Sequence, residues 1–548
     1  HPVLASLNTT QRTALLHWVG DYLLGHRVAL FIDTSIAWQG LEPTHSAPTN
    51  HPSLYQGPLL LADRLRHPLF KQLPHIITLY RGLLVMVDAV DVAAFHVSKW
   101  ASFAHNLFVL ADQWQWLDTG ALRTLVDAEH QHPAFKAANH PLGADQQTVK
   151  APIVQDTDLG VFCRTILLGI TLIFKEVSRR YVTANGLAMR SPQGEALALD
   201  ILDAYAQLAP FVISLYGYQG FPTYQQVCHT VLEAITETTA QGRSHTPSLA
   251  DRLIRHLHAA CWTALDQADS RARRHSPTVS ISYARQLRHL YFLQTSEILI
   301  PYLDASVIQA CCLPLVEVYL FSDTRPHARA LLEVSHRVVL SILEADGGQR
   351  EDLIALSTFI APFYDRVLFE TYPRYLEFPQ LRTAYTLLVQ QLMKYQPALA
   401  WAVLERLMQQ LDQQIPEGSS TSGPPSQVVR HADTHARTAL SPSPSPVSRS
   451  VSVHRMTSSL LQQGQYLQLL TDQVASVPFP YFSQRLLPKI RWYILQEPNA
   501  VAQMSALKSL HQSVLQSIDV GKKEVALKWL LALEHDVTSR HKLRVCVH

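Results

Sequence analysis

Amphipathic helical patterns follow one another without long breaks between residues 326 and 411, and they constrain what the whole chain can fold into. Each of the four patterns places apolar residues at steps of three and four, so one face of every helix must be buried against another helix. Successive helices with short connections predict stacked helical hairpins, as in an α-solenoid. Glycine and proline punctuate the series at Gly347, Gly348, Pro373, Pro379 and Pro397.

The remainder of the chain shows the same helical periodicity, and no run alternates convincingly in the way that predicts β-strands. We therefore predict an all-α fold, an α-solenoid of stacked helical hairpins of the HEAT or armadillo kind. Proline also falls inside two of the predicted helices. We expect Pro210 and Pro362 to interrupt them, because proline lacks the backbone donor that a helix requires.

Composition and periodicity divide the chain into four regions. Residues 1–150 form an N-terminal helical region, 151–416 a central solenoid, and 455–548 a C-terminal helical region. Residues 417–454 differ, because they are rich in serine and proline and include the run from Ser441 to Pro446. Such a segment cannot bury enough apolar surface to offset the entropy lost on ordering, so we predict a disordered linker there.

The charge of the chain argues against nucleic acid as its main partner. Lysine and arginine number 46 against 44 aspartates and glutamates, a net charge of +2, and the basic residues are scattered. A surface that binds nucleic acid needs a concentrated basic field. Apolar residues at 47% and charged residues at 16% instead provide material for a large core.

No segment is predicted to span a membrane. The run from Thr165 to Phe174 is apolar, but a spanning helix needs about twenty residues. The longer run from His75 to Val97 contains Asp88 and Asp91, which are costly to place in lipid. We therefore expect a protein that is soluble or peripheral to a membrane.

The cysteines and histidines do not form a recognisable metal site. The six cysteines show neither C-x-x-C nor C-x-x-H spacing. Cys163, Cys228 and Cys261 lie on apolar helix faces, where a free thiol packs as a small hydrophobic group. His256 and His258 are two residues apart, so they face different directions on a helix. We predict no metal and no cofactor.

No catalytic constellation is visible either. The chain contains no phosphate-binding glycine loop, no G-x-S-x-G motif and no H-E-x-x-H motif. Asp88 and Asp91 lie one helical turn apart, as do Asp200 and Asp203, but the simpler interpretation is a polar helix face. We predict a protein without catalytic residues that is not an enzyme.

The helix that follows Pro379 supports the most detailed expectation. Arg382 is rotated by about 100° from Leu381, so it should reach the edge of a groove, where a charge reversal spares the fold. The residues expected to be buried on this helix are Leu381, Ala384, Leu387 and Leu388.

The helix-packing pieces that carry a family resemblance are Leu332 to Leu340, Ala361 to Tyr364, Leu368-Phe369, Tyr372-Pro373, Pro379 to Ala384 and Leu399 to Leu407. A weaker likeness continues in Leu467 to Leu470 and in Val477 to Pro480. These pieces resemble peroxin eight, the fungal import peroxin on the matrix side of the peroxisomal membrane.

The resemblance implies a non-enzymatic, peripheral protein on the matrix side of the peroxisome. Such a protein bridges the docking and RING ubiquitin-ligase complexes and helps the targeting-signal receptor to release its cargo. The expected partners are that receptor and the peroxins of the docking and RING complexes, and nucleic acid is not among them. On the matching pieces, the candidate partner-binding residues are Arg382, Gln380 and His336.

Two other functions are compatible with the sequence. One is a HEAT- or armadillo-like adaptor in cytosolic or nuclear transport, and the other is an enzyme whose helical catalytic domain carries no known motif. Localisation to the peroxisome is expected from the resemblance alone. The chain ends Arg544 to His548 rather than S-K-L, and we find no internal targeting signal.

Overall fold

The computed structural model describes residues 7–20, 68–86, 95–105, 158–182, 192–217, 220–241, 248–272, 283–320, 328–345, 350–414, 462–497, 500–516 and 520–547. Every regular element in these residues is a helix and none is a strand, which confirms the predicted all-α fold. The chain divides into two compact units, His1–Ser341 and Ile342–His548, and the four regions expected from composition stay a prediction. The predicted linker at 417–454 lies outside the described residues and stays a prediction.

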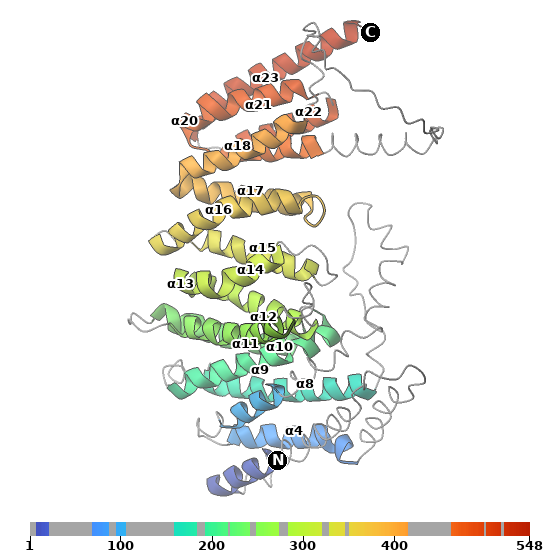
Figure 1. Ribbon diagram of the computed structural model, residues 1–548, viewed down its shortest axis with the longest axis vertical. Helices are drawn as coiled ribbons and strands as arrows, with labels where there is room; N and C mark the ends of the chain where they lie inside the picture. The colour runs from blue at the N-terminus through green and yellow to red at the C-terminus, as the bar shows by residue number, and fades with distance from the viewer. Residues whose placement is uncertain are drawn as a thin grey trace, which may run out of the picture. The chain divides into compact units, whose positions relative to one another are not determined.

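The first unit is a series of long helices that pack on their neighbours (Figure 1). These helices are α4 (Pro68–Met86), α8 (Asp158–Val177), α9 (Pro192–Tyr216), α10 (Pro222–Gln241), α11 (Leu249–Ala272), α12 (Tyr283–Leu299) and α14 (Leu313–Leu320). α4 packs on α8, α8 on α9 and α10, and α12 on both α9 and α11. The rings of Phe174, Tyr205 and Tyr224 meet where α8, α9 and α10 come together, and all three are buried.

The four helical patterns predicted between residues 326 and 411 are confirmed. They correspond to α15 (Ala328–Glu344), most of which belongs to the first unit, and to α16 (Glu351–Thr371), α17 (Phe378–Tyr395) and α18 (Pro397–Gln414) of the second unit. The second unit continues with a helix over residues 462–472 and a continuous helical stretch formed by α20 (Phe479–Tyr481), a π-helical turn (Phe482–Leu486) and α21 (Leu487–Gln496). It ends with α22 (Ala500–Gln516) and α23 (Val520–Val547).

In the second unit, successive helical pairs contact each other through two sets of polar side chains. In one set, α17 is joined to helix 462–472 and that helix to α22, through Arg382, Asp472 and Ser509. In the other set, Tyr493 of α21 donates a hydrogen bond to a carbonyl of α18, and Arg491 pairs with Asp536 of α23. This repeated contact between successive pairs is the arrangement of a solenoid.

Both interruptions predicted at proline are wrong, because α9 continues through Pro210 and α16 through Pro362. Proline removes one backbone hydrogen bond, but apolar residues that are buried on either side hold each helix together. In α16, Ile360 and Val367 are buried while Pro362 is exposed. Water can therefore reach the carbonyl that Pro362 leaves without its helical donor, so the helix need not end there.

The prediction for α17 is confirmed at most positions and wrong at one. Leu381, Ala384 and Leu388 are buried, but Leu387 is only half-buried. Tyr385 takes the inner position instead, and its hydroxyl donates a hydrogen bond of 3.0 Å to the carbonyl oxygen of Val403 in α18. The buried stripe steps by three and four from Leu381, which leaves residue 387 at its edge.

One helix in the part of the chain that the structure describes is long and apolar enough to cross a membrane, and it is α9. Of its most apolar segment, 72% is buried against the rest of the protein. That degree of burial is the property of a core helix, so α9 carries no argument for a membrane span.

Candidate functional site

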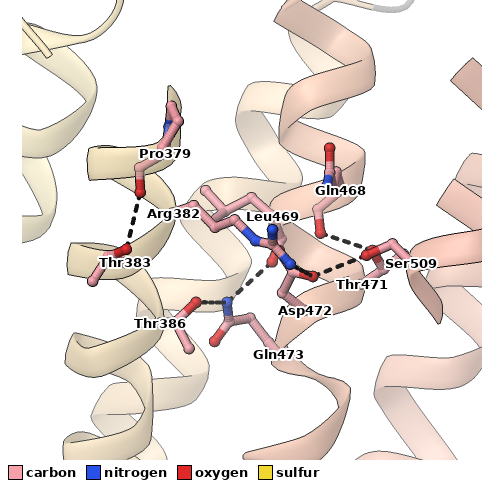
Figure 2. A network of polar contacts seen from close by, with 10 residues as sticks. All are labelled: Pro379, Arg382, Thr383, Thr386, Gln468, Leu469, Thr471, Asp472, Gln473 and Ser509. Atoms are coloured by element: carbon pink, nitrogen blue, oxygen red, sulfur yellow. Dashed lines mark hydrogen bonds and ion pairs between the residues drawn. The ribbon is translucent and has the colours of Figure 1, made fainter. Parts of the chain in front are cut away.

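The candidate residue Arg382 lies in a network of polar contacts that joins three helices (Figure 2). Its Nε and Nη2 donate to the two carboxylate oxygens of Asp472 at 2.6 and 2.9 Å, a bidentate ion pair. The hydroxyl of Ser509 on α22 donates to the same carboxylate at 3.0 Å. The side chain of Asp472 is 7% exposed and that of Arg382 is 46% exposed, so the network lies at the surface with its acidic end covered.

A second set of polar contacts, around Gln473, lies beside this network. The amide nitrogen of Gln473, which is buried, lies 3.1 Å from the hydroxyl of Thr386 on α17 and 3.1 Å from the carbonyl oxygen of Leu469 (Figure 2). The contact with Thr386 crosses from the end of helix 462–472 to α17, while the contact with Leu469 stays within helix 462–472 and holds the Gln473 side chain in place. Arg382 therefore reaches the surface as predicted, but it has a structural partner that the sequence did not reveal.

Gln380, the second candidate, is exposed at the start of α17 and has a defined local role. Its side-chain oxygen accepts a hydrogen bond of 3.0 Å from the backbone nitrogen of Glu377, which completes a capping box. The cap explains why α17 begins at this point, with Pro379 in its first turn. Gln380 and Arg382 thus share one exposed end of the helix.

His336, the third candidate, is buried on α15 with 5% of its surface exposed. Burial lowers the pKa of His336 to about 4, so the imidazole is neutral at physiological pH. A buried neutral ring cannot offer its nitrogens to a partner at the surface. The structure therefore assigns His336 to the core and leaves Arg382 and Gln380 as the accessible candidates.

Polar contacts also organise α11 in the first unit. The carboxylate of Asp251 is 1% exposed and accepts hydrogen bonds from the backbone nitrogens of Ser248 and Asp304, at 3.2 and 3.0 Å. The hydroxyl of Ser248 in turn accepts from the backbone nitrogen of Asp251 at 3.0 Å. One buried carboxylate therefore caps the start of α11 and holds the chain that follows α12.

Asp203 and His256 contact each other between two helices, a pairing that the sequence did not predict. Nε2 of His256 on α11 lies 3.4 Å from Oδ1 of Asp203 on α9. The hydrogen bond with Asp203 raises the pKa of His256 above its usual value. Burial acts to raise the pKa of Asp203, but the contact with His256 and the nearby Arg288 together hold it below its usual value. The pair links two helices, and the carboxylate of Asp200, one turn before Asp203 on α9, lies near both groups; burial, together with repulsion from Asp203, raises the pKa of Asp200.

Neither a metal centre nor a reactive thiol is present among the residues that the structure describes. No group of three or more histidine, cysteine, aspartate or glutamate side chains there could hold a metal ion. Cys261, Cys311 and Cys312 are buried free thiols, and burial raises the pKa of Cys261 to about 11. The other predicted carboxylate pair, Asp88 and Asp91, lies outside the described residues.

The comparisons with known proteins identify one region. Residues 250–344 match the family model of the PEX8 central TPR-like domain, a range that runs from α11 into α15. Of the pieces that carry the sequence resemblance, the one from Leu332 to Leu340 lies inside this range. No curated protein and no solved structure matches the chain. In this region the chain resembles peroxin 8, and the resemblance supports a role as a peroxin in peroxisomal protein import.

Proposed function

We propose that the chain is a non-enzymatic scaffold of peroxisomal matrix protein import that lies peripherally on the matrix side of the membrane. In this role it bridges the docking and RING ubiquitin-ligase complexes and assists the release of cargo from the targeting-signal receptor. The observation that carries the proposal is the match of residues 250–344 to the PEX8 central TPR-like domain.

The helical architecture is suited to such a role. Stacked helical pairs bury their apolar faces in one another and expose a long surface that carries a row of side chains from each helix. In the second unit, Arg382 and Gln380 stay our candidates for contact with an import component, because both are exposed at one end of α17.

The proposal is tested with the tagged full-length chain in cells that lack their own peroxin 8. We expect matrix enzymes to return to the peroxisome, the docking and RING complexes to co-purify with the chain, and alkaline carbonate to extract the chain from membranes. A chain that stays in the cytosol or nucleus and leaves matrix enzymes outside the organelle would refute the import role and favour a transport adaptor.

A matched pair of variants tests whether the PEX8-like region is required. Asp251→Ala removes the buried carboxylate that caps α11 inside the matched range, and we expect it to reduce import. Glu524→Ala removes a carboxylate on α23 that is 76% exposed and whose partner among the described residues is Lys528, one turn away, so this variant should import normally. Equal import by both variants would show that the matched region does not carry the function.

A further inference from the structure

An arginine is held on two aromatic rings at the surface of the second unit. Trp401 of α18 stacks on Tyr481 with 5.9 Å between ring centroids and 28° between ring planes. The guanidinium carbon of Arg485 lies 5.6 Å from the centroid of Trp401 and 5.5 Å from that of Tyr481. A cation within about 6 Å of a ring centroid is attracted to the ring face. The guanidinium of Arg485 is therefore positioned before any partner arrives.

Lys489 and Trp492 extend this cluster along the same helix. They follow Arg485 by four and seven residues, the spacing that places side chains on one side of a helix. All three are exposed, and Trp492 has 44% of its surface open to solvent. We call Tyr481, Arg485, Lys489 and Trp492 the basic–aromatic face.

The positive charge of this face is not neutralised within the described part of the chain. Glu405 accepts a hydrogen bond of 2.6 Å from the indole nitrogen of Trp401, and Asp536 pairs with Arg491. Neither Arg485 nor Lys489 has an ion pair with a described carboxylate. Two neighbouring cations without an acidic partner attract a negatively charged ligand.

We propose that the basic–aromatic face binds an acidic segment of another protein, one that carries an aromatic or aliphatic side chain between its carboxylates. The planar guanidinium of Arg485 matches a carboxylate in a bidentate geometry, and Lys489 provides a second positive charge one turn away. Trp492 supplies the apolar contact, as exposed tryptophans commonly do at protein interfaces.

A protein segment fits this face better than a lipid surface does. A helix that lies in a membrane interface presents a continuous row of large apolar residues. Within α20 and α21, the exposed large apolar side chains are Phe479 and Trp492, which lie thirteen residues apart, and the charged Lys489 and Arg491 are near Trp492 in the sequence. The proposal goes beyond the import role, because it concerns binding by the purified chain and does not depend on its localisation.

The test measures fluorescence polarisation of a labelled amphipathic peptide, with glutamates on one side and tryptophan and leucine on the other. A peptide with glutamine in place of every glutamate serves as the comparison. We expect the glutamate peptide to bind the purified full chain at least about tenfold more tightly, the factor that one charge-assisted hydrogen bond can provide. Added salt should weaken the binding.

Variants then locate the bound peptide. Lys489→Glu leaves the aromatic platform of Arg485 untouched and should weaken binding by about tenfold, and Arg485→Glu should do the same. Lys508→Glu, at an exposed lysine of α22 outside the face, should bind the peptide as the unchanged protein does. Circular dichroism establishes that each variant is folded. If Arg485→Glu does not fold, the binding of the peptide by Lys489→Glu alone tests the proposal.

Three results would overturn the proposal. The first is equal binding of the glutamate and glutamine peptides, and the second is undiminished binding by Lys489→Glu. The third is a failure to bind the glutamate peptide together with binding to phosphatidylserine vesicles that Lys489→Glu abolishes, which would make the face a lipid-binding surface. Because all three are measured on the purified chain, they are distinct from a failure of the import assay in cells.

Discussion

The ion pair between Arg382 and Asp472 allows the sharpest test of how the second unit is held together. Arg382→Glu would place a second carboxylate beside Asp472, whose side chain is only 7% exposed. A fully exposed ion pair contributes at most about 1 kcal/mol, whereas removing one partner of a buried pair costs about 3–5 kcal/mol. Because Arg382 is 46% exposed and Asp472 is nearly buried, we expect an intermediate loss of about 2 kcal/mol in the free energy of unfolding.

The control exchanges the two charges. Arg382→Glu combined with Asp472→Arg again brings opposite charges together, so it should recover part of the lost stability. Recovery should be incomplete, since the hydrogen bond from Ser509 to the carboxylate of Asp472 is lost as well. Urea denaturation of the four proteins of the double-mutant cycle, followed by circular dichroism, measures the coupling energy between the two positions, which includes the like-charge repulsion in each single variant.

An Arg382→Glu protein that unfolds at the same urea concentration as the unchanged protein would refute this reasoning and restore the expectation that the charge reversal spares the fold. The exchange variant also separates structure from binding. It keeps an ion pair but presents a negative charge where Arg382 presented a positive one. Loss of co-purifying import components from this folded variant would support Arg382 as a contact, and normal co-purification would remove it from the candidates.

Three further perturbations test the packing of the same unit. Leu388→Asp, at a fully buried position, should cost about 3–5 kcal/mol, and Leu387→Asp, at a half-buried one, clearly less; equal losses in thermal melts would contradict the difference in burial. Tyr493→Phe removes a hydroxyl that lies 2.8 Å from a carboxylate oxygen of Asp412 and 3.0 Å from the carbonyl oxygen of Met408. Urea denaturation should therefore show a loss of roughly 1–3 kcal/mol. Burial raises the pKa of Asp365 from 3.8 to about 6, although the guanidinium of Arg406 lies 2.9 Å away. Because the folded protein holds this proton more tightly than the unfolded chain does, the stability that the carboxyl contributes is present below pH 3.8 and is lost as the pH rises through about 6. The melting temperature of the unchanged protein should therefore fall relative to that of Asp365→Asn over this range, and a constant difference between the two would show that Asp365 does not titrate as described.

Features that depend on a few neighbouring residues could be predicted from the sequence. The order of α15 to α18 follows from local periodicity, and the starts of α17 and α18 follow from Pro379 and Pro397. Pro210 and Pro362 show the limit of the same local reasoning. Whether a proline ends a helix depends on how much apolar surface is buried on either side of it, and that is a property of the tertiary structure.

The partners of charged residues could not be predicted, because they depend on how one helical pair stacks on the next. Asp472 lies 90 residues after Arg382, and the spacing within α17 indicates only which side of its own helix an arginine occupies. When helical pairs stack, a charged residue that looks free on its own helix can form an ion pair with a residue of the next helical pair, as Arg382 does with Asp472. Residues that contact other proteins should instead be sought among exposed charges that the neighbouring pairs leave without a counterpart. Within the described part of the second unit Arg485 and Lys489 meet that criterion and Arg382 does not, so the face along α21 is the stronger candidate for recognition of a partner.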